Sequence, residues 1–127
     1  METIAEVSII DDSMIEIHID KDIDFELEHA IQLNVKIHEI GENRKFYQLT
    51  VYGCRTVPSR EARTYSISPE GSRFKMAEAI VVKSLSQKMV FNFMINVERP
   101  SIRTKLFTCE NEAKEWLESL NSSSTAV

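Results

Sequence analysis

Basic and hydroxyl side chains recur in this sequence directly after its most strand-like segments. They are Arg55, Ser59 and Arg60 after one segment, Lys83, Ser84 and Ser86 after a second, and Thr108 after a third. Ligands of open α/β sheets bind beyond the carboxyl ends of the strands, and helix N-termini at that edge favour anions. We therefore predict an anion-binding or partner-binding rim, where Ser59 could also accept a phosphate. A simpler interpretation is that the hydroxyl side chains only cap helices, each contributing about 1 kcal/mol.

Other reactive residue types form no convincing constellation in the sequence. Cys54 follows a strand beside Arg55, which would favour a thiolate, but no histidine partner is identifiable. The three histidines, His18, His29 and His38, show no metal-ligand spacing and no nearby carboxylate cluster. We therefore expect no catalytic residues, no metal and no cofactor.

One acidic segment resembles the opening of a calcium loop. Asp20, Asp22 and Asp24 alternate, but Phe25 stands where such a loop needs glycine and Ile31 where it needs a bidentate glutamate. The segment is better interpreted as a solvated turn in which Asp22 or Asp24 caps a helix.

The first half of the chain predicts an antiparallel hairpin followed by a helix and a central strand. Residues 4–10 and 14–19 alternate apolar and polar side chains around the turn cluster Asp11-Asp12-Ser13. Residues 25–40 fit both strand alternation and a broad helical face. Their length favours a helix, with Gly41 at its C′ position. The β-rich run 46–52 follows as a strand.

The second half alternates predicted helices and strands. A helix begins near Arg60, capped by Ser59, and ends at the turn 68–71. The nearly continuous apolar run 76–82 is typical of a parallel strand that is covered on both faces. A last strand is expected at residues 102–107.

Two amphipathic helices complete the pattern. Ser84 to Gln87 match a capping box, and Arg99-Pro100 end the helix that it opens. Its stripe at helical spacing consists of Leu85, Met89, Phe93 and Val97, with Val90 and Met94 beside it. The last helix carries a stripe of Ala113, Trp116, Leu117 and Leu120. We expect the aromatic residues Phe91, Phe93 and Trp116 to lie in the core.

The order of these elements predicts an α/β fold with a mixed, mostly parallel sheet, an N-terminal hairpin and four helices. A chain of 127 residues suits one domain, which we place at residues 1–120, followed by a frayed polar tail at 121–127. With 43% hydrophobic and 28% charged residues, the composition is that of an ordinary globular domain.

Charge is segregated along the chain. Residues 1–42 carry twelve acidic and two basic side chains, whereas residues 43–109 carry four acidic and twelve basic ones. Such asymmetry can steer an oppositely charged partner, or the two blocks can neutralise each other within the fold. The acidic pI of about 5.2 and the lack of a stripe of basic and aromatic residues argue against nucleic-acid binding.

We expect a cytoplasmic protein without a membrane span. The apolar runs are short, the two cysteines fit free thiols, and the N-terminus has no signal core.

Several phrases resemble a known group of proteins. They are Val57-Pro-Ser-Arg-Glu-Ala-Arg63, Thr104-Lys-Leu-Phe-Thr108, Glu112-Ala113 and Trp116-Leu117. Together with the order of elements over residues 5–120, they are similar to small uncharacterised bacterial proteins of the STAS, or SpoIIAA-like, fold. The functional STAS domains are anti-sigma-factor antagonists with an Asp-Ser-Ser-Gly phrase whose second serine is phosphorylated. Here Pro58 stands at the Asp position, Ser59 at the first Ser and Arg60 at the phospho-acceptor, so the phosphorylation switch is not expected to carry over.

The resemblance implies a non-enzymatic regulatory or protein-interaction module that acts through the Ser59 loop and the helix after it. Its partner would be another regulatory protein, and a homodimer is a further expectation. An alternative is a binder of a small anionic or amphipathic, lipid-like ligand near Arg60, Lys83 and Ser84.

Overall fold

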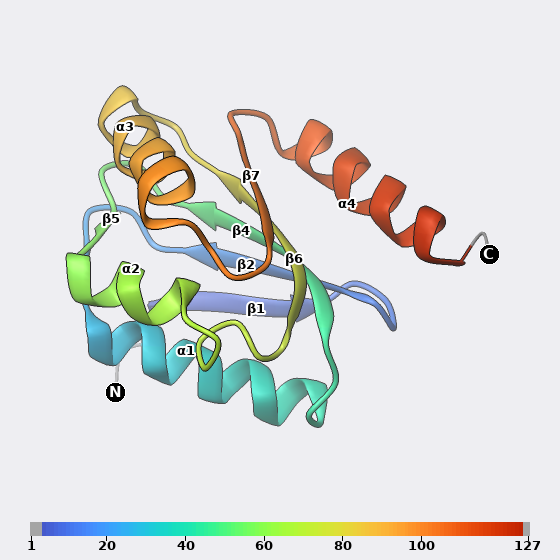
Figure 1. Cartoon of the computed structure of the whole chain (residues 1–127). Helices are drawn as coiled ribbons and strands as arrows, with labels where there is room; N and C mark the ends of the chain where they lie inside the picture. Colours follow the sequence, from blue (N-terminus) through green and yellow to red (C-terminus); the bar gives the residue numbers. More distant parts are fainter. Residues whose placement is uncertain (1–3, 126–127) are drawn as a thin grey trace.

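The structure, a computed structural model, describes residues 4–125. Its main feature is a five-stranded sheet with strand order β1-β2-β4-β6-β7 (Figure 1). The strands span Ala5–Ile9 (β1), Met14–Ile19 (β2), Phe46–Tyr52 (β4), Lys75–Val81 (β6) and Arg103–Phe107 (β7). β1 pairs with β2 antiparallel and every other neighbouring pair is parallel, which confirms the mixed, mostly parallel sheet.

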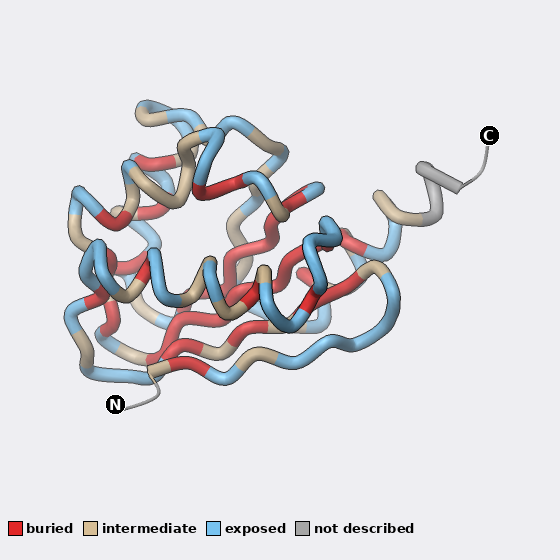
Figure 2. The backbone as a smooth tube through the Cα atoms, turned by 90° about the horizontal axis from the view of Figure 1, so that it is seen from below, coloured by how far each residue is buried: buried red, intermediate tan, exposed pale blue. Residues whose placement is uncertain are grey.

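The helices lie on both faces of the sheet, and the strand order determines which face each helix covers. Neighbouring strands in the sheet follow one another in the order of the sequence. Parallel crossovers of constant hand put all connecting helices on one face. The connecting elements are α1 (Leu27–Gly41), α2 (Arg60–Ile67), α3 (Leu85–Phe93) and the π-helical turn η1 (Met94–Glu98). They share one apolar core with the sheet, whereas α4 (Glu110–Thr125) packs on the opposite face. In Figure 2 the long buried stretches of the chain run through the middle of the molecule.

The side chains of β4 alternate between the two cores. Phe46 and Tyr52 face α1, α2 and α3, whereas Leu49 and Val51 face α4. All seven residues of β4 are buried, as expected of the central strand of the sheet.

The N-terminal hairpin forms as predicted. The Asp11 carboxylate accepts hydrogen bonds from the backbone N–H groups of Ser13 (2.8 Å) and Met14 (3.0 Å). These bonds and a third from the Ser13 hydroxyl lower the pKa of Asp11 below its ordinary value.

The helical interpretation of residues 25–40 is confirmed, but both of its predicted ends are wrong. The N-cap is Glu26, whose N–H donates to His29 Nδ1 (2.9 Å), and Asp24 lies in a short strand instead. At the other end Glu42 takes the left-handed conformation (φ 52°), and Gly41 is the last helical residue. A Cβ atom at Gly41 would lie 2.4 Å from the Phe46 ring, so glycine is needed there for close packing rather than for its φ.

The sequence analysis missed a small second sheet. β3 (Asp24–Phe25) pairs in parallel with β5 (Val57–Pro58), which ties the segment before α1 to the segment before α2. Strands of two residues carry no detectable periodicity, so their pattern could not be read.

The final helix is longer than expected. α4 continues to Thr125, through most of the segment predicted to be a frayed tail, and residues 126–127 lie outside the described residues. Its predicted stripe packs as expected: Ala113 and Leu117 are buried, and Trp116 and Leu120 are partly buried against them.

Candidate functional site

The loop after β4 and the start of α3 are joined by one buried side chain. Gln87 donates from Nε2 to the carbonyl oxygens of Gly53 (2.7 Å) and Thr56 (2.9 Å). Its Oε1 accepts from the backbone N–H groups of Lys83 (2.8 Å) and Ser84 (3.2 Å). Gln87 therefore holds the two halves of the predicted rim together. Sequence analysis identified it only as a capping residue.

Gly53 allows a third loop to approach this place. A Cβ atom at Gly53 would lie 2.4 Å from the backbone nitrogen of Lys21, which belongs to the loop after β2. Only glycine leaves room for that contact, so the loops that follow β2, β4 and β6 meet at one edge of the sheet.

The structure divides the predicted rim into two groups. Arg55 is exposed and its guanidinium bonds to Asp22 through Nε to Oδ1 and through Nη2 to Oδ2 (2.9 Å). The hydrogen bond from Arg55 holds the pKa of the Asp22 carboxyl below its ordinary value. Ser59 is the N-cap of α2 and its hydroxyl accepts from the Ala62 N–H (3.1 Å), while Arg60 lies exposed at the first position of the helix.

Lys83 and Ser84 form the other group. They line a surface hollow of about 310 Å³ together with Val82, Leu85, Lys88 and Thr108. The Ser84 hydroxyl accepts from the Gln87 N–H (3.2 Å), which confirms its capping role. Thr108 does not precede α4 directly, because Cys109 stands between it and Glu110. Arg55, Ser59 and Arg60 are not among the residues that line this hollow, so the rim is not a single site.

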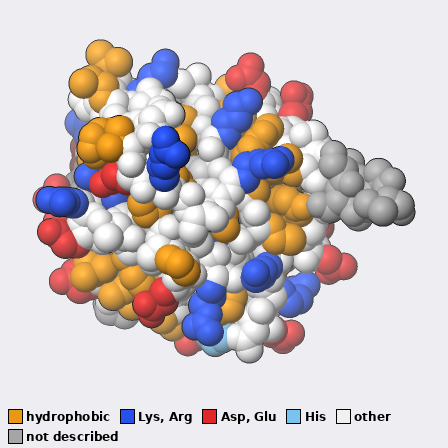
Figure 3. Space-filling view, in the orientation of Figure 1, with side chains coloured by type: hydrophobic (Ala, Val, Ile, Leu, Met, Phe, Trp, Pro, Cys, Tyr) orange, Lys and Arg blue, Asp and Glu red, His pale blue; other side chains and the backbone are white. Residues whose placement is uncertain are grey.

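The apolar stripe that the sequence places on α3 is exposed to solvent. Leu85, Met89, Phe93 and Val97 are between 50% and 73% exposed. The prediction that Phe93 lies in the core is therefore wrong. The buried face of α3 and η1 consists of Gln87, Phe91 and Met94 instead. Figure 3 shows apolar side chains gathered over α3 in the upper left of the view.

The exposed charged side chains within the segment that carries this stripe have one sign. The chain carries no acidic residue from Ala79 to Val97, whereas Lys83 and Lys88 are both exposed. Glu98, at the end of η1, is engaged by Arg63 of α2 (Nε to Oε1, 3.0 Å). The exposed face of α3 and η1 is therefore apolar and basic. We call Leu85, Met89, Phe93 and Val97 the α3 stripe.

A second apolar row lies on α1 and is less exposed. Leu27, Ile31 and Val35 are 37% to 49% exposed. Glu28 and Glu39 of the same helix are exposed, so the surroundings of this row are more acidic than those of the α3 stripe.

The core beneath α1 and α2 contains a buried polar cluster. Lys75 Nζ bonds to Glu78 Oε1 (2.9 Å), and Glu78 Oε2 accepts from Gln48 Nε2 (3.1 Å) and from the Thr50 hydroxyl (2.8 Å). Burial and the Glu78 charge raise the pKa of the neighbouring Tyr52 phenol far above its ordinary value.

These side chains line a partly enclosed cavity. Its volume is about 40 Å³, and the buried Gln48 Oε1 has no hydrogen-bond partner. A water needs on the order of 10–15 Å³ measured in this way, whereas drug-sized ligands occupy pockets of roughly 300–1,000 Å³. The cavity is therefore of a size for a few ordered waters and too small for a lipid-like ligand.

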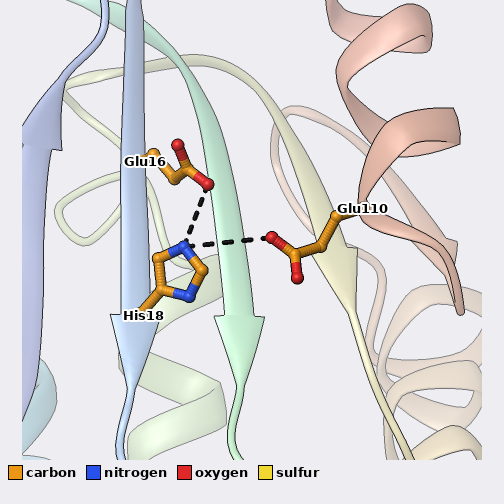
Figure 4. A group of neighbouring side chains, drawn as sticks. All are labelled: Glu16, His18 and Glu110. Carbon is orange, nitrogen blue, oxygen red and sulfur yellow. Dashed lines mark hydrogen bonds and ion pairs between the residues drawn. The ribbon is translucent and has the colours of Figure 1, made fainter.

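The structure places one histidine, His18, beside two carboxylates that the sequence analysis did not connect with it. Glu16, His18 and Glu110 place a carboxylate oxygen, an imidazole nitrogen and a second carboxylate oxygen within 4.8 Å of one another (Figure 4). The alternation Glu16-x-His18 on a strand was a readable signal, because residues two apart share a face. Glu110 comes from the start of α4 and only the fold brings it near.

Comparison with known protein families identifies the chain. A family model described as a domain of unknown function, DUF7793, matches residues 8–121. The chain belongs to this family. No curated protein and no solved structure matches it significantly. The DUF7793 span includes the α3 stripe, the polar cluster, the hollow and all three residues of the Glu16 cluster.

A helix that spans a bilayer needs about 20 predominantly apolar residues. Within the described part of the chain, no helix is long and apolar enough to serve as a transmembrane segment.

Proposed function

We propose that this protein is a non-enzymatic, STAS-like interaction module that binds another regulatory protein through the α3 stripe. The observation that carries the proposal is the exposure of Leu85, Met89, Phe93 and Val97 along one side of α3 and η1. Contiguous exposed apolar patches on small domains mark interaction sites more often than single exposed side chains do.

Folding alone does not explain the α3 stripe. The opposite side of the same segment already supplies the contacts with the sheet, since Phe91 and Met94 are buried in the core and Gln87 is fully hydrogen bonded. Removing an apolar side chain from water contributes roughly 25 cal/mol per Å², and the α3 stripe gains this free energy only when another surface covers it. A partner would supply that surface.

Charge defines the kind of partner. Lys83 and Lys88 are exposed beside the α3 stripe and the segment has no acidic residue before Glu98. We therefore propose an acidic partner surface with a row of apolar side chains, such as an amphipathic helix. Charge complementarity would steer the encounter and the apolar row would supply most of the affinity.

The proposed STAS-like kinship is supported by topology. The structure has the antiparallel N-terminal hairpin, the mostly parallel sheet and the four helices that the resemblance implies. Gln87 links the start of α3 to the loop that leads to Ser59, so the helix that carries the α3 stripe begins beside the loop implied by the resemblance. The Ser59 hydroxyl serves as a helix cap, and the proposal requires no phosphorylation.

A second candidate function is the binding of a small anion in the hollow lined by Lys83, Ser84, Lys88 and Thr108. The observation in its favour is that two cations and a helix start share one depression. Titration calorimetry with inorganic phosphate tests it. Saturable heat that is lost in Lys83→Met/Lys88→Met supports the anion site, and its absence at millimolar phosphate removes it.

Photo-crosslinking in cells tests the main proposal. A benzophenone side chain at position 89 or 93 is expected to capture a discrete protein, and one at position 31 on α1 serves as the matched control. The captured protein is then purified and titrated against the native chain and Met89→Ser/Phe93→Ser. Loss of at least tenfold affinity in the double variant, with Ile31→Ser unchanged, supports the proposal. Equal binding by all three chains, or no crosslink at either α3 position, refutes it.

A further inference from the structure

The Glu16 cluster joins two elements that are remote in the sequence. Glu16 and His18 stand two residues apart on β2 and therefore share the face of the sheet on which α4 lies, and Glu110 is the first residue of α4. His18 Nε2 lies 2.9 Å from Glu16 Oε1 and 4.0 Å from Glu110 Oε1 (Figure 4).

The spacing of these atoms suits a small divalent ion. Zinc binds imidazole nitrogen and carboxylate oxygen at about 2.0–2.2 Å, which in a tetrahedral arrangement separates the ligand atoms by roughly 3.4 Å. The three atoms lie within 4.8 Å of one another, so movements of about an ångström would close them around one ion. Figure 4 shows the Glu16 and Glu110 carboxylates approaching the His18 ring from two sides.

The surrounding charges leave the cluster attractive to a cation. Lys114 Nζ lies 3.7 Å from Glu16 Oε1 and offsets one of the two carboxylates. Glu6 of β1 stands opposite His18 in the antiparallel register and is exposed. Directly opposed residues have Cβ atoms about 5 Å apart on the same face, so Glu6 adds a negative charge to the face on which the cluster lies.

The alternative is an ordinary surface network of hydrogen bonds and ion pairs. In that interpretation Glu16 accepts from His18 and pairs with Lys114, and Glu110 only contributes to the start of α4. Both interpretations use the same side chains, and the donor set suits a metal ion. One imidazole with two carboxylates is a ligand combination of transition-metal sites, and the half-exposed position leaves room for water as the remaining ligand.

We propose that Glu16, His18 and Glu110 form a binding site for a divalent transition-metal ion of the zinc class. The ion would link β2 to the N-terminal end of α4 and keep at least one coordination position for water. The site is separate from the α3 stripe, and its test is independent of the proposed interaction.

Titration calorimetry of the full chain with zinc chloride tests the site, after treatment with a chelator and in parallel with magnesium chloride. We expect one zinc ion per chain, little heat from magnesium, and at least tenfold weaker zinc binding in His18→Ala and in Glu110→Gln. The melting temperature should rise with zinc in the native chain and stay constant in His18→Ala.

Two matched variants control for unspecific binding. Glu112→Gln removes the same charge from the same helical turn, but residue 112 lies about 200° around the helix from residue 110, so zinc affinity should be unchanged. Cys109→Ser tests whether the exposed thiol next to Glu110 is the ligand instead. No saturable zinc binding at 1 mM, equal affinity of the native chain and His18→Ala, or loss of binding in Cys109→Ser alone would each overturn the proposal.

Discussion

α3 and α4 look alike in the sequence and behave in opposite ways in the structure. Each carries an apolar row at helical spacing, and each follows a parallel strand of the sheet. The row on α4 packs against the sheet, with Ala113 and Leu117 buried. The row on α3 faces solvent, and the same segment turns Gln87, Phe91 and Met94 inward.

The difference shows that an apolar periodicity identifies a helix without identifying its buried side. α4 has one apolar side, so burial follows directly from the pattern. α3 has two, and the inner one is marked by a glutamine whose amide satisfies four backbone groups of the neighbouring loops. Hydrogen bonding thus decides the orientation that hydrophobicity leaves open, and it leaves an apolar surface free for binding.

The strongest test of this comparison is truncation on the inner side of α3. Phe91 is fully buried, and the centroid of its ring lies 4.7 Å from the centroid of the Tyr52 ring. Phe91→Ala should lower the free energy of unfolding by about 4 kcal/mol, because it removes a large buried side chain and leaves a cavity. Chemical denaturation measures the loss. A loss below 1 kcal/mol would mean that this side of α3 is not the buried one.

Truncation on α4 should be nearly as costly. Leu117 is fully buried on the side of α4 that faces the sheet. Leu117→Ala should lower the free energy of unfolding by about 3 kcal/mol. Denaturation in urea gives the value. Leu120→Ala, at a partly buried position, is expected to cost less, and the reverse order would contradict the packing of α4 described here.

The contribution of the Gln87 hydrogen bonds can be measured separately from that of the volume of its side chain. Gln87→Leu keeps the size of the side chain but leaves the carbonyl oxygens of Gly53 and Thr56 without their donor. The free energy of unfolding should fall by about 2 kcal/mol, as expected for buried polar groups that lose their partners. Gln32→Leu, at an exposed position of α1, is the control and should change it little. Equal effects of the two substitutions would exclude an orienting role for Gln87.

The core beneath α3 should also be sensitive to alkaline pH. The pKa of Tyr52 is raised above its ordinary value of 10.0, mainly by burial and then by the Glu78 charge. The unfolded state therefore releases the phenol proton first, and stability that is present below pH 10 is lost as the pH rises. Between pH 10 and 11 the native chain should lose about 1 kcal/mol more than Tyr52→Phe, because the unfolded phenol is only half ionised at the start of this interval. Parallel stability curves of the two proteins over this interval would be inconsistent with a buried phenol.

The smallest effect is expected on the outer side of α3. Phe93→Ala makes the same chemical change as Phe91→Ala two residues further along, but at a side chain that is half exposed. The free energy of unfolding should change by less than about 0.5 kcal/mol. A loss comparable to that of Phe91→Ala would mean that the α3 stripe serves folding, and it would remove the main support for the proposed interaction.

The parts of the fold that were predictable from the sequence are those with one strong local signal. The strand at 46–52 has β-rich composition, the hairpin has its Asp11 turn, and Ser59 and Ser84 precede their helices as caps. Each signal lies within a few residues of the element that it defines, so tertiary packing did not need to be known.

Other features depend on residues that meet only in the folded chain. Glycine is needed at position 41, the last residue of α1, because the Phe46 ring packs closely against it. The two-residue strands β3 and β5 are defined only by their pairing with each other. The predicted rim failed as a single site for the same reason, since Arg55 turns to Asp22 while Lys83 lines a different hollow. His18 acquires Glu110 as a neighbour only when α4 folds back over the sheet.

Placing the strands in chain order has a consequence for biosynthesis. Each strand of the main sheet pairs with the one made just before it, so the sheet can extend at one edge while the ribosome is still adding residues. The cover for Leu49, Val51, Ala77 and Ala79 comes last, because α4 begins only at Glu110. A chain released before that point would have its strands but would expose this apolar face, where chaperones or aggregation would compete for it.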